Sequence, residues 1–404
     1  MNGRIVIVGA GHAAVRFCEE MRGHGFAGSL IMISEETHRP YERPPLSKAI
    51  LCSNSGPEHH LLLTEVQQAS LAIDWRGGCR AMVIDRSARQ VHLTDGTALA
   101  YDYLVLATGA APRRLDCRGA ELGGVHYLGN ADQALQLRAA MMAAPQSVIV
   151  IGGGFIGLEV AAAARHHGHG VTVIENAARC AGRLLPPSLS AELTDLHHRN
   201  GVTIRTGGNV TQIIGGHRTE AVQLGSGELL PADLIVVGIG SRPQTELAEG
   251  CGLAADNGIL VDSNGRTSDP HILAIGDVAA IKGSDGSAPQ RRESWDNAQG
   301  TAQRAAAAIM SVEQPDPAPP WFWTDQYYCN LQFIGQVTDD CDEQVIERDG
   351  GGRVYLYERH GTLVAAGLIN AGRDRRRLLK AVGNCEEVDA VKAGFAGPSL
   401  KLAS

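Results

Sequence analysis

Two glycine-rich segments carry the strongest chemical signal in this 404-residue sequence. They read IVIVGAGHAA at residues 5–14 and IGGGFIGLEV at residues 151–160, and each joins a β-branched run to a helix-forming stretch. In this pattern the first glycine permits a tight turn, the second lets the backbone approach a pyrophosphate, and the third position allows the helix to pack closely on the strand. The defining residues are Gly9, Gly11 and Ala14 in the first segment and Gly152, Gly154 and Gly157 in the second.

An acidic residue follows each segment at the distance that a dinucleotide-binding unit requires. Glu35 lies 26 residues after Gly9, near the end of SLIMISEE, and Glu175 lies 23 residues after Gly152, at the end of VTVIE. A carboxylate at this place accepts hydrogen bonds from ribose hydroxyls. Because the order strand, glycines, helix, strand and acid occurs twice, we predict two dinucleotide sites. The first is assigned to FAD and the second to NADH, with electrons passing between them.

The elements that must position these segments are repeated as well. Residues 81–109 alternate apolar and polar side chains, turn at an Asp-Gly pair and end in YLVLATG, and residues 210–240 follow the same plan and end in LIVVGIG. Each half fits a parallel β-α-β sheet with an inserted antiparallel meander. The predicted fold class is α/β, with two tandem Rossmann-like dinucleotide-binding domains and a C-terminal α+β domain. The predicted boundaries are residues 1–112 and 237–314 for the FAD-binding domain, 113–236 for the NAD-binding domain and 315–404 for the C-terminal domain.

Composition and charge narrow the class of protein. The formal net charge of −8 argues against a nucleic-acid binder, and the longest apolar stretch, residues 147–164, contains Glu159 and several glycines, so it is a poor membrane span. None of the nine cysteines forms a C-x-x-C pair, which argues against a redox-active dithiol or a zinc site of that spacing and suits a reducing cytoplasm. The histidines of RHHGHG, residues 165–170, are interpreted as solvated side chains rather than metal ligands.

Several further motifs lie outside the generic nucleotide-binding pattern and together span nearly the whole chain. They are RPYERPPLSKAIL (39–51), ATG (107–109), AIGDVA (274–279), RRESWDNAQ (291–299) and WFWTDQY (321–327). With these motifs the chain resembles the FAD-dependent pyridine-nucleotide:ferredoxin reductases of bacterial oxygenase systems, a putidaredoxin-reductase-like family with a glutathione-reductase-like fold. Members of this family serve aromatic-ring dioxygenases and haem-thiolate monooxygenases.

The resemblance implies roles for individual side chains. Arg43 and Lys48 would lie along the FAD, where cations favour the anionic reduced flavin, and Asp277 would accept hydrogen bonds from the ribityl chain. The backbone of Trp295 would meet the flavin pyrimidine edge, and Glu159 would lie near the nicotinamide, so that Lys48 and Glu159 are the catalytic candidates. Further cofactor-binding candidates beside the motifs are His12, Ala13, Ala81, Thr108, Gly109, Phe155, Ile156, Arg183 and Gly240.

One pair of residues departs from the family pattern. The family usually has Arg-Thr where this chain has Gly129–Asn130, and that arginine commonly contacts the FAD. We therefore assign no flavin contact to Gly129.

The lack of a paired dithiol shapes the expected mechanism. NADH is expected to give a hydride from its C4 to N5 of a tightly but non-covalently bound FAD, which then releases electrons singly to a 2Fe–2S ferredoxin that supplies a terminal oxygenase of aromatic hydrocarbon catabolism. Two alternatives stay open: a rubredoxin reductase or NADH oxidase on the same fold, and a redox-sensing flavoprotein.

A basic run near the C-terminus is a candidate docking surface for the ferredoxin. The stretch GRDRRRLLK, residues 372–380, contains Arg373, Arg376 and Arg377, and an acidic ferredoxin needs a local basic patch on this acidic chain. An ordinary solvated helix start is the competing interpretation. Whether the protein is a monomer or a dimer is left open.

Overall fold

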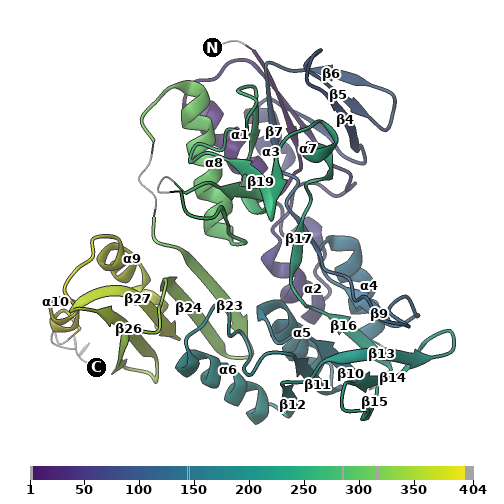
Figure 1. Cartoon of the computed structure of the whole chain (residues 1–404), viewed down its shortest axis with the longest axis vertical. Helices are drawn as coiled ribbons and strands as arrows, with labels where there is room; N and C mark the ends of the chain where they lie inside the picture. The colour runs from purple at the N-terminus through teal and green to yellow at the C-terminus, as the bar shows by residue number, and fades with distance from the viewer. Residues whose placement is uncertain (1–2, 143, 145, 284–285, 315–317, 396–404) are drawn as a thin grey trace. The chain divides into compact units, whose positions relative to one another are not determined.

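The computed structural model describes residues 3–395 except residues 143, 145, 284–285 and 315–317 (Figure 1). The chain forms two compact units, one of residues 1–181 and 193–316 and the other of residues 182–192 and 317–404. In the part of the chain that the structure describes, no helix combines the length and the apolar composition needed to span a membrane.

A five-stranded parallel sheet holds the first glycine segment. Its order is β20-β7-β1-β2-β3, and the strands are Ile272–Ala274, Tyr103–Leu106, Arg4–Val8, Ser29–Ile33 and Ile73–Arg76. Helices α1 (His12–Gly23) and α8 (Trp295–Met310) pack side by side on one face of this sheet (Figure 1). The meander of β4 (Ala81–Asp85), β5 (Gln90–Leu93) and β6 (Ala98–Ala100) supplies side chains to the core on the other face.

A second five-stranded parallel sheet holds the second glycine segment. Its order is β12-β11-β10-β16-β9, and the strands are Val202–Thr206, Gly170–Glu175, Ser147–Ile151, Leu234–Val237 and Val125–Tyr127. Helix α5 (Phe155–His166) follows β10 directly. The meander of β13 (Val210–Gly215), β14 (Thr219–Leu224) and β15 (Leu229–Pro231) repeats the plan of the first half. The predicted duplication of a parallel sheet with a meander is confirmed.

Shorter elements lie between the strands of the two sheets. The segment between β2 and β3 contains η1 (Pro44–Ser47), α2 (Ala49–Cys52), η2 (Pro57–His59) and α3 (Glu65–Ser70). The chain passes into the second half through β8 (Ala110–Pro112) and back through β17 (Ser241–Pro243), and these two strands pair antiparallel. Other elements of this unit are α4 (Ala131–Met141), α7 (Glu246–Gly250), β18 (Ala255–Asp256), β19 (Gly258–Val261), η3 (Gly276–Val278), β21 (Ala279–Ile281) and β22 (Gln290–Arg291).

The second unit is built on an antiparallel sheet of order β23-β24-β27-β26-β25. Its strands are Trp321–Gln326, Cys329–Gly335, Thr362–Ile369, Arg353–Arg359 and Asp342–Glu347. Helices α9 (Arg375–Gly383) and α10 (Val388–Ala393) share a buried apolar core with this sheet. The first six residues of helix α6 (Pro187–Arg199) also belong to this unit, where Glu192 accepts hydrogen bonds from Arg353 and from the hydroxyl of Tyr355. The predicted C-terminal α+β domain is confirmed.

Candidate functional site

The first glycine segment forms a tight turn between β1 and α1. Gly9 has φ +111°, and a Cβ atom added there would lie 2.1 Å from the carbonyl oxygen of Ala107. Only glycine tolerates both conditions. Gly11 is the N-cap residue of α1 and has no side chain that could cap the helix. A Cβ atom added at Gly11 would meet no other atom within 4 Å, so the space in front of the helix is open. The first amides of α1 are therefore available to a pyrophosphate, and the helix dipole favours its charge.

The second glycine segment repeats this geometry closely. Gly152 has φ +106°, and its added Cβ would lie 2.2 Å from the carbonyl oxygen of Gly238. Gly154 is the N-cap of α5, again without a side-chain cap hydrogen bond and with nothing within 4 Å of an added Cβ. At the third position a Cβ on Gly157 would come 2.0 Å from the oxygen of Gly152. Both turns therefore fit the pyrophosphate of a dinucleotide.

The two acidic residues are held differently. Glu175 is the last residue of β11, and its carboxylate accepts hydrogen bonds from the backbone N–H groups of Gly153 at 2.6 Å and Ala177 at 2.7 Å. This places it at the turn that a ribose would face. Glu35 lies two residues beyond the end of β2 and is exposed, with a weak ion pair to Arg80 at 3.8 Å. Glu35 is thus available to a ribose but is not fixed by backbone hydrogen bonds.

A buried histidine stands at the start of α1. His12 is 8% exposed, and its Nε2 atom has no hydrogen-bond partner among the described residues. Its ring meets the ring of Trp295 edge to face, with centroids 6.5 Å apart. Burial, with a contribution from the charge of Arg43, lowers the pKa of His12 to about 4, so the ring is neutral near pH 7. A buried polar atom without a partner is what a site shaped for a bound molecule shows.

Asp277 is brought to the same turn by the end of β20. The N–H of Gly276 donates to the hydroxyl of Thr301 on α8 at 2.9 Å, and a Cβ on Gly276 would lie 3.0 Å from that of Ala13. The short helix η3 that carries Asp277 therefore abuts the start of α1. Burial and the neighbouring charge of Glu293 raise the pKa of Asp277 to about 7, against the opposing charges of Arg291 and Arg43. Ser294 caps α8 as expected, accepting from the N–H of Asn297 at 3.1 Å.

Arg43 is fixed by a network that sequence reasoning missed. Its guanidinium pairs with Glu36 at 2.6 Å and donates to the hydroxyl of Tyr41 and to the carbonyl of Gly129. A Cβ on Gly129 would lie 2.6 Å from Cδ of Pro112, so a larger residue requires Pro112 to shift. The only sequence signal for this network was the unusual glycine itself.

The two halves of the first unit meet in a buried ion pair. The Nζ atom of Lys48 lies 2.8 Å from Oε1 of Glu159, and the hydroxyl of Ser47 donates to the other carboxylate oxygen. Glu159 is 5% exposed and sits on α5, just beyond the second glycine segment. The structure thus joins the loop after β2 to helix α5 through the two residues predicted as catalytic.

The remaining predicted positions fall at several places. Thr108 exchanges two hydrogen bonds with Gln244, Gly109 accepts from the backbone of Gln244, and Gly240 accepts from the backbone of Arg113, all where the chain crosses between the halves. Ala81 begins β4, and Phe155 and Ile156 begin α5. Arg183 belongs to the second unit.

The histidines of residues 165–170 correct one prediction. His169 is fully buried rather than solvated: its Nδ1 accepts from the N–H of Gln146 at 3.1 Å and its Nε2 donates to the carbonyl of Met141 at 2.8 Å. His167 also makes a hydrogen bond, to the carbonyl of Leu51 at 2.7 Å. The periodicity of the sequence did not reveal that the turn after α5 folds back on its neighbours.

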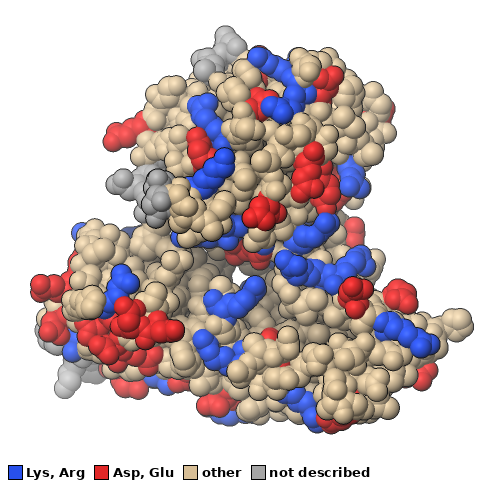
Figure 2. All heavy atoms as spheres, viewed as in Figure 1, with Lys and Arg blue, Asp and Glu red and all other residues tan. Residues whose placement is uncertain are grey.

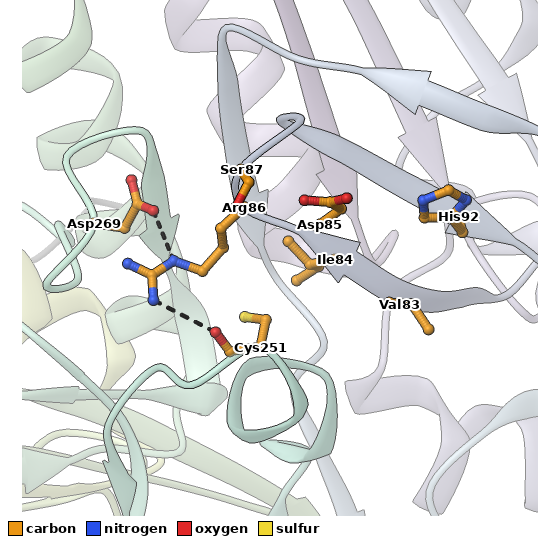
Figure 3. Close-up of a pocket in the computed structure, with 8 residues that line it drawn as sticks. All are labelled: Val83, Ile84, Asp85, Arg86, Ser87, His92, Cys251 and Asp269. Carbon is orange, nitrogen blue, oxygen red and sulfur yellow. Dashed lines mark hydrogen bonds and ion pairs between the residues drawn. The ribbon is translucent and has the colours of Figure 1, made fainter.

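An open hollow elsewhere in the first unit has a different character (Figure 3). It is lined by Val83, Ile84, Asp85, Arg86, Ser87, His92, Cys251 and Asp269. Arg86 donates to Asp269 at 2.8 Å and to the carbonyl of Cys251 at 3.4 Å. The charges of Arg86 and Asp269 are therefore already paired with each other. None of the predicted site residues lines this hollow, and it does not resemble a nucleotide site.

Comparison with known proteins agrees with this arrangement. A family model described as pyridine nucleotide-disulphide oxidoreductase matches residues 3–302, and one described as reductase C-terminal matches residues 321–403. The chain is similar to rhodocoxin reductase of Rhodococcus erythropolis, with 39% identity over 402 residues that cover 99% of this chain and 94% of that protein.

Two further proteins show the same likeness. A ferredoxin–NAD(P)+ reductase of Sphingomonas sp is 38% identical over 385 residues, which cover 93% of this chain and 92% of that protein. The crystal structure of the covalent putidaredoxin reductase–putidaredoxin complex matches with a TM-score of 0.87 and 35% identity, covering 95% of this chain and 94% of that one.

Proposed function

Since the chain belongs to the pyridine nucleotide-disulphide oxidoreductase family and is an oxidoreductase, we propose that it passes electrons from NADH through FAD to a 2Fe–2S ferredoxin of an oxygenase system. The observation that carries this proposal is the likeness, over nearly the whole chain, to reductases named for rhodocoxin, ferredoxin and putidaredoxin. The spacing of the cysteines agrees with it: the nine include no C-x-x-C pair, so electrons would leave the flavin without a dithiol relay of that kind. The terminal enzyme is an oxygenase, in our proposal an aromatic-ring dioxygenase, and the reaction takes place in the cytoplasm.

The residues of the first half fit an FAD that is held tightly but without a covalent bond. Bound FAD accepts a hydride from a nicotinamide and gives up electrons one at a time. The amides at the start of α1 bind its pyrophosphate, His12 offers its unpartnered ring nitrogen, and Asp277 accepts hydrogen bonds from ribityl hydroxyls. Arg43, held by Glu36 and Tyr41, places a fixed positive charge beside this site.

The residues of the second half fit the nicotinamide dinucleotide. The amides at the start of α5 bind the pyrophosphate, and Glu175, already fixed at the turn, accepts hydrogen bonds from the adenosine ribose. Glu159 and Lys48 then orient the nicotinamide end, and their opposite charges neutralise each other within a buried setting. Positioning is the main task, because hydride transfer needs no acid or base from the protein.

The C-terminal basic run supplies the proposed docking surface for the ferredoxin. Arg373 and Arg376 are exposed, whereas Arg377 donates to the carbonyl of Val391 and lies over the ring of Phe395 at 4.4 Å. Arg375 lies over the ring of Trp321 at 4.6 Å. Acidic side chains gather on the visible face of this unit (Figure 2). We assign Arg373 and Arg376 to the partner and Arg377 to holding α9 and α10 together.

A comparison of electron acceptors tests the proposed function. Anaerobic titration with NADH, followed by visible absorbance, is expected to bleach the flavin with about one equivalent. Steady-state turnover is then measured with a 2Fe–2S ferredoxin, with rubredoxin and with oxygen as alternative acceptors. Turnover that is fastest with the ferredoxin supports the proposal, and equal or faster turnover with rubredoxin or oxygen overturns it.

A further inference from the structure

The loop that carries Lys48 is bonded mainly to helices of the other half. Residues 44–55 follow β2 in sequence, yet they contact helices α4 and α5, which lie beside the second sheet. From these contacts we propose that Arg138 and His167 are positioning residues for the Lys48–Glu159 pair. This inference rests on the proposed function, in which that pair orients the nicotinamide beside the flavin.

Arg138 closes the far end of the loop. This residue of α4 donates from one guanidinium nitrogen to the carbonyls of Ile50 at 3.4 Å, Ser53 at 3.1 Å and Ser55 at 2.6 Å. These carbonyls belong to the end of α2 and the turn after it, where a helix leaves its last carbonyls without partners. Arg138 therefore acts as a cap that is supplied from a distant helix.

His167 gives the loop a second attachment on the helix that carries Glu159. Its Nε2 atom donates to the carbonyl of Leu51 at 2.7 Å, and it is the C-cap residue of α5. Glu159 lies eight residues earlier, about 12 Å along the same helix. Helix α5 thus holds the loop at two points, through Ser47 and Lys48 at Glu159 and through Leu51 at His167.

The local structure of the loop explains why such attachments matter. Helix α2 has four residues, far fewer than an isolated helix needs to be stable. Lys48 is its N-cap residue, and its carbonyl accepts from the N–H groups of Leu51 at 3.1 Å and Cys52 at 3.0 Å. A shift of Leu51 therefore moves the backbone of Lys48 directly. Because misplacement by about 1 Å can cost a large factor in rate, the two attachments bear on the rate of flavin reduction.

Single substitutions with matched partners test the proposal. His167→Leu removes the hydrogen bond, whereas His167→Gln keeps a nitrogen donor at the position of Nε2. His166→Leu, at the exposed neighbouring histidine, is the control. Arg138→Met removes the cap, and Arg138→Lys keeps a positive charge on a single donor nitrogen. Circular dichroism and flavin content establish that each variant is folded and loaded.

Two readouts separate the attachment from its effect on the reaction. Hydrogen–deuterium exchange of a peptide covering residues 46–55 is expected to quicken in His167→Leu and Arg138→Met and to stay near wild type in His167→Gln and His166→Leu. Stopped-flow reduction of the flavin at saturating NADH is expected to slow about three- to tenfold in the same two variants, with less than about a twofold change in the Kd for NADH.

The outcomes that overturn the proposal are distinct from those that overturn the proposed function. Hydrogen exchange at the wild-type rate in both His167→Leu and Arg138→Met would show that the loop does not depend on these residues. Faster exchange with an unchanged reduction rate would show that the attachments do not act on the Lys48–Glu159 pair. If the flavin of the Lys48→Met and Glu159→Gln variants is reduced by NADH at the wild-type rate, the proposed role of the pair fails.

Discussion

The two glycine turns share their backbone and differ in their side chains. Gly9 and Gly152 adopt φ values of +111° and +106°. At each, the missing Cβ atom leaves room for a backbone carbonyl that follows a strand, that of Ala107 or that of Gly238. The residue after the second glycine is the buried His12 in one turn, whose Nε2 atom has no hydrogen-bond partner among the described residues, and Phe155 in the other. The backbone is repeated because a pyrophosphate is the same in both dinucleotides. The difference in side chains agrees with the proposed function, in which one site would retain its cofactor and the other would release its nucleotide in each turnover.

The largest expected effect separates the two turns by the cofactor that each binds. Gly11→Glu puts a carboxylate where an added Cβ meets no protein atom, so the fold is preserved but the pyrophosphate is repelled. We expect colourless protein from this variant, and yellow protein that NADH no longer reduces from Gly154→Glu. The flavin-to-protein absorbance ratio and an anaerobic NADH titration measure both. Gly23→Glu, at an exposed glycine near the end of α1, is the control. Flavin retained by Gly11→Glu would reverse the assignment.

The next prediction concerns the titratable groups of the first turn in flavin-free protein. The pKa of His12 is lowered to about 4, so the folded state binds fewer protons than the unfolded state between about pH 4 and 6.5, and stability rises with pH there. The pKa of Asp277 is raised to about 7, so its contribution falls with rising pH between about 4 and 7. The two slopes oppose each other. Each group contributes at most about 1.4 kcal/mol per pH unit, which gives about 3.5 kcal/mol for His12 and about 4 kcal/mol for Asp277 over their windows.

Variants of these two groups make the opposed slopes visible. In urea unfolding between pH 4.5 and 6.5, His12→Leu is expected to lose stability with rising pH, and Asp277→Asn to gain it. The wild-type protein is expected to be flatter than either. Parallel curves for all three proteins would contradict the assigned pKa shifts.

The third position of each turn gives a smaller effect. A Cβ on Gly157 would lie 2.0 Å from the oxygen of Gly152, so Gly157→Ala is expected to destabilise the fold by about 1–3 kcal/mol. The first turn already holds alanine at Ala14, and Ala14→Gly is expected to cost about 1 kcal/mol, through helix propensity. Urea unfolding compares the two variants. A gain in stability from Gly157→Ala, which helix propensity alone would give, would show that α5 has room for a methyl group beside Gly152.

The smallest effect concerns the choice of nicotinamide. Glu175 is fixed by two backbone hydrogen bonds and would repel a 2′-phosphate, so we expect NADH to be preferred to NADPH. Glu175→Ala is expected to reduce kcat/KM for NADH about tenfold and to narrow the preference. Glu35→Ala, the equivalent change in the first turn, is the matched control and is expected to leave the ratio unchanged. A wild-type preference for NADPH would contradict the role of Glu175.

Local sequence pattern predicted the parts of the structure that depend on local backbone geometry. The β-branched runs, the glycine turns and the Ser294 cap each depend on a few neighbouring residues, and all three are observed. Contacts between distant residues were beyond that reasoning. The pairing of Lys48 with Glu159, the burial of His169 and the network around Arg43 each join residues that only tertiary packing brings together. Resemblance supplied the importance of Lys48 and Glu159, but not their contact.

Helix α6 bears on how the chain can be divided. Its first six residues belong to the C-terminal unit, where Leu189 is fully buried and lies so close to Gly367 that a Cβ there would come within 2.5 Å of it. A chain truncated before β23 keeps Leu189 and Glu192 but loses the strands that cover them. The apolar helix face around Leu189 would then be exposed, which favours aggregation. A truncation or fusion at the proline-rich stretch 315–320 would therefore divide the core of the C-terminal unit, because residues 187–192 of that core lie before the cut.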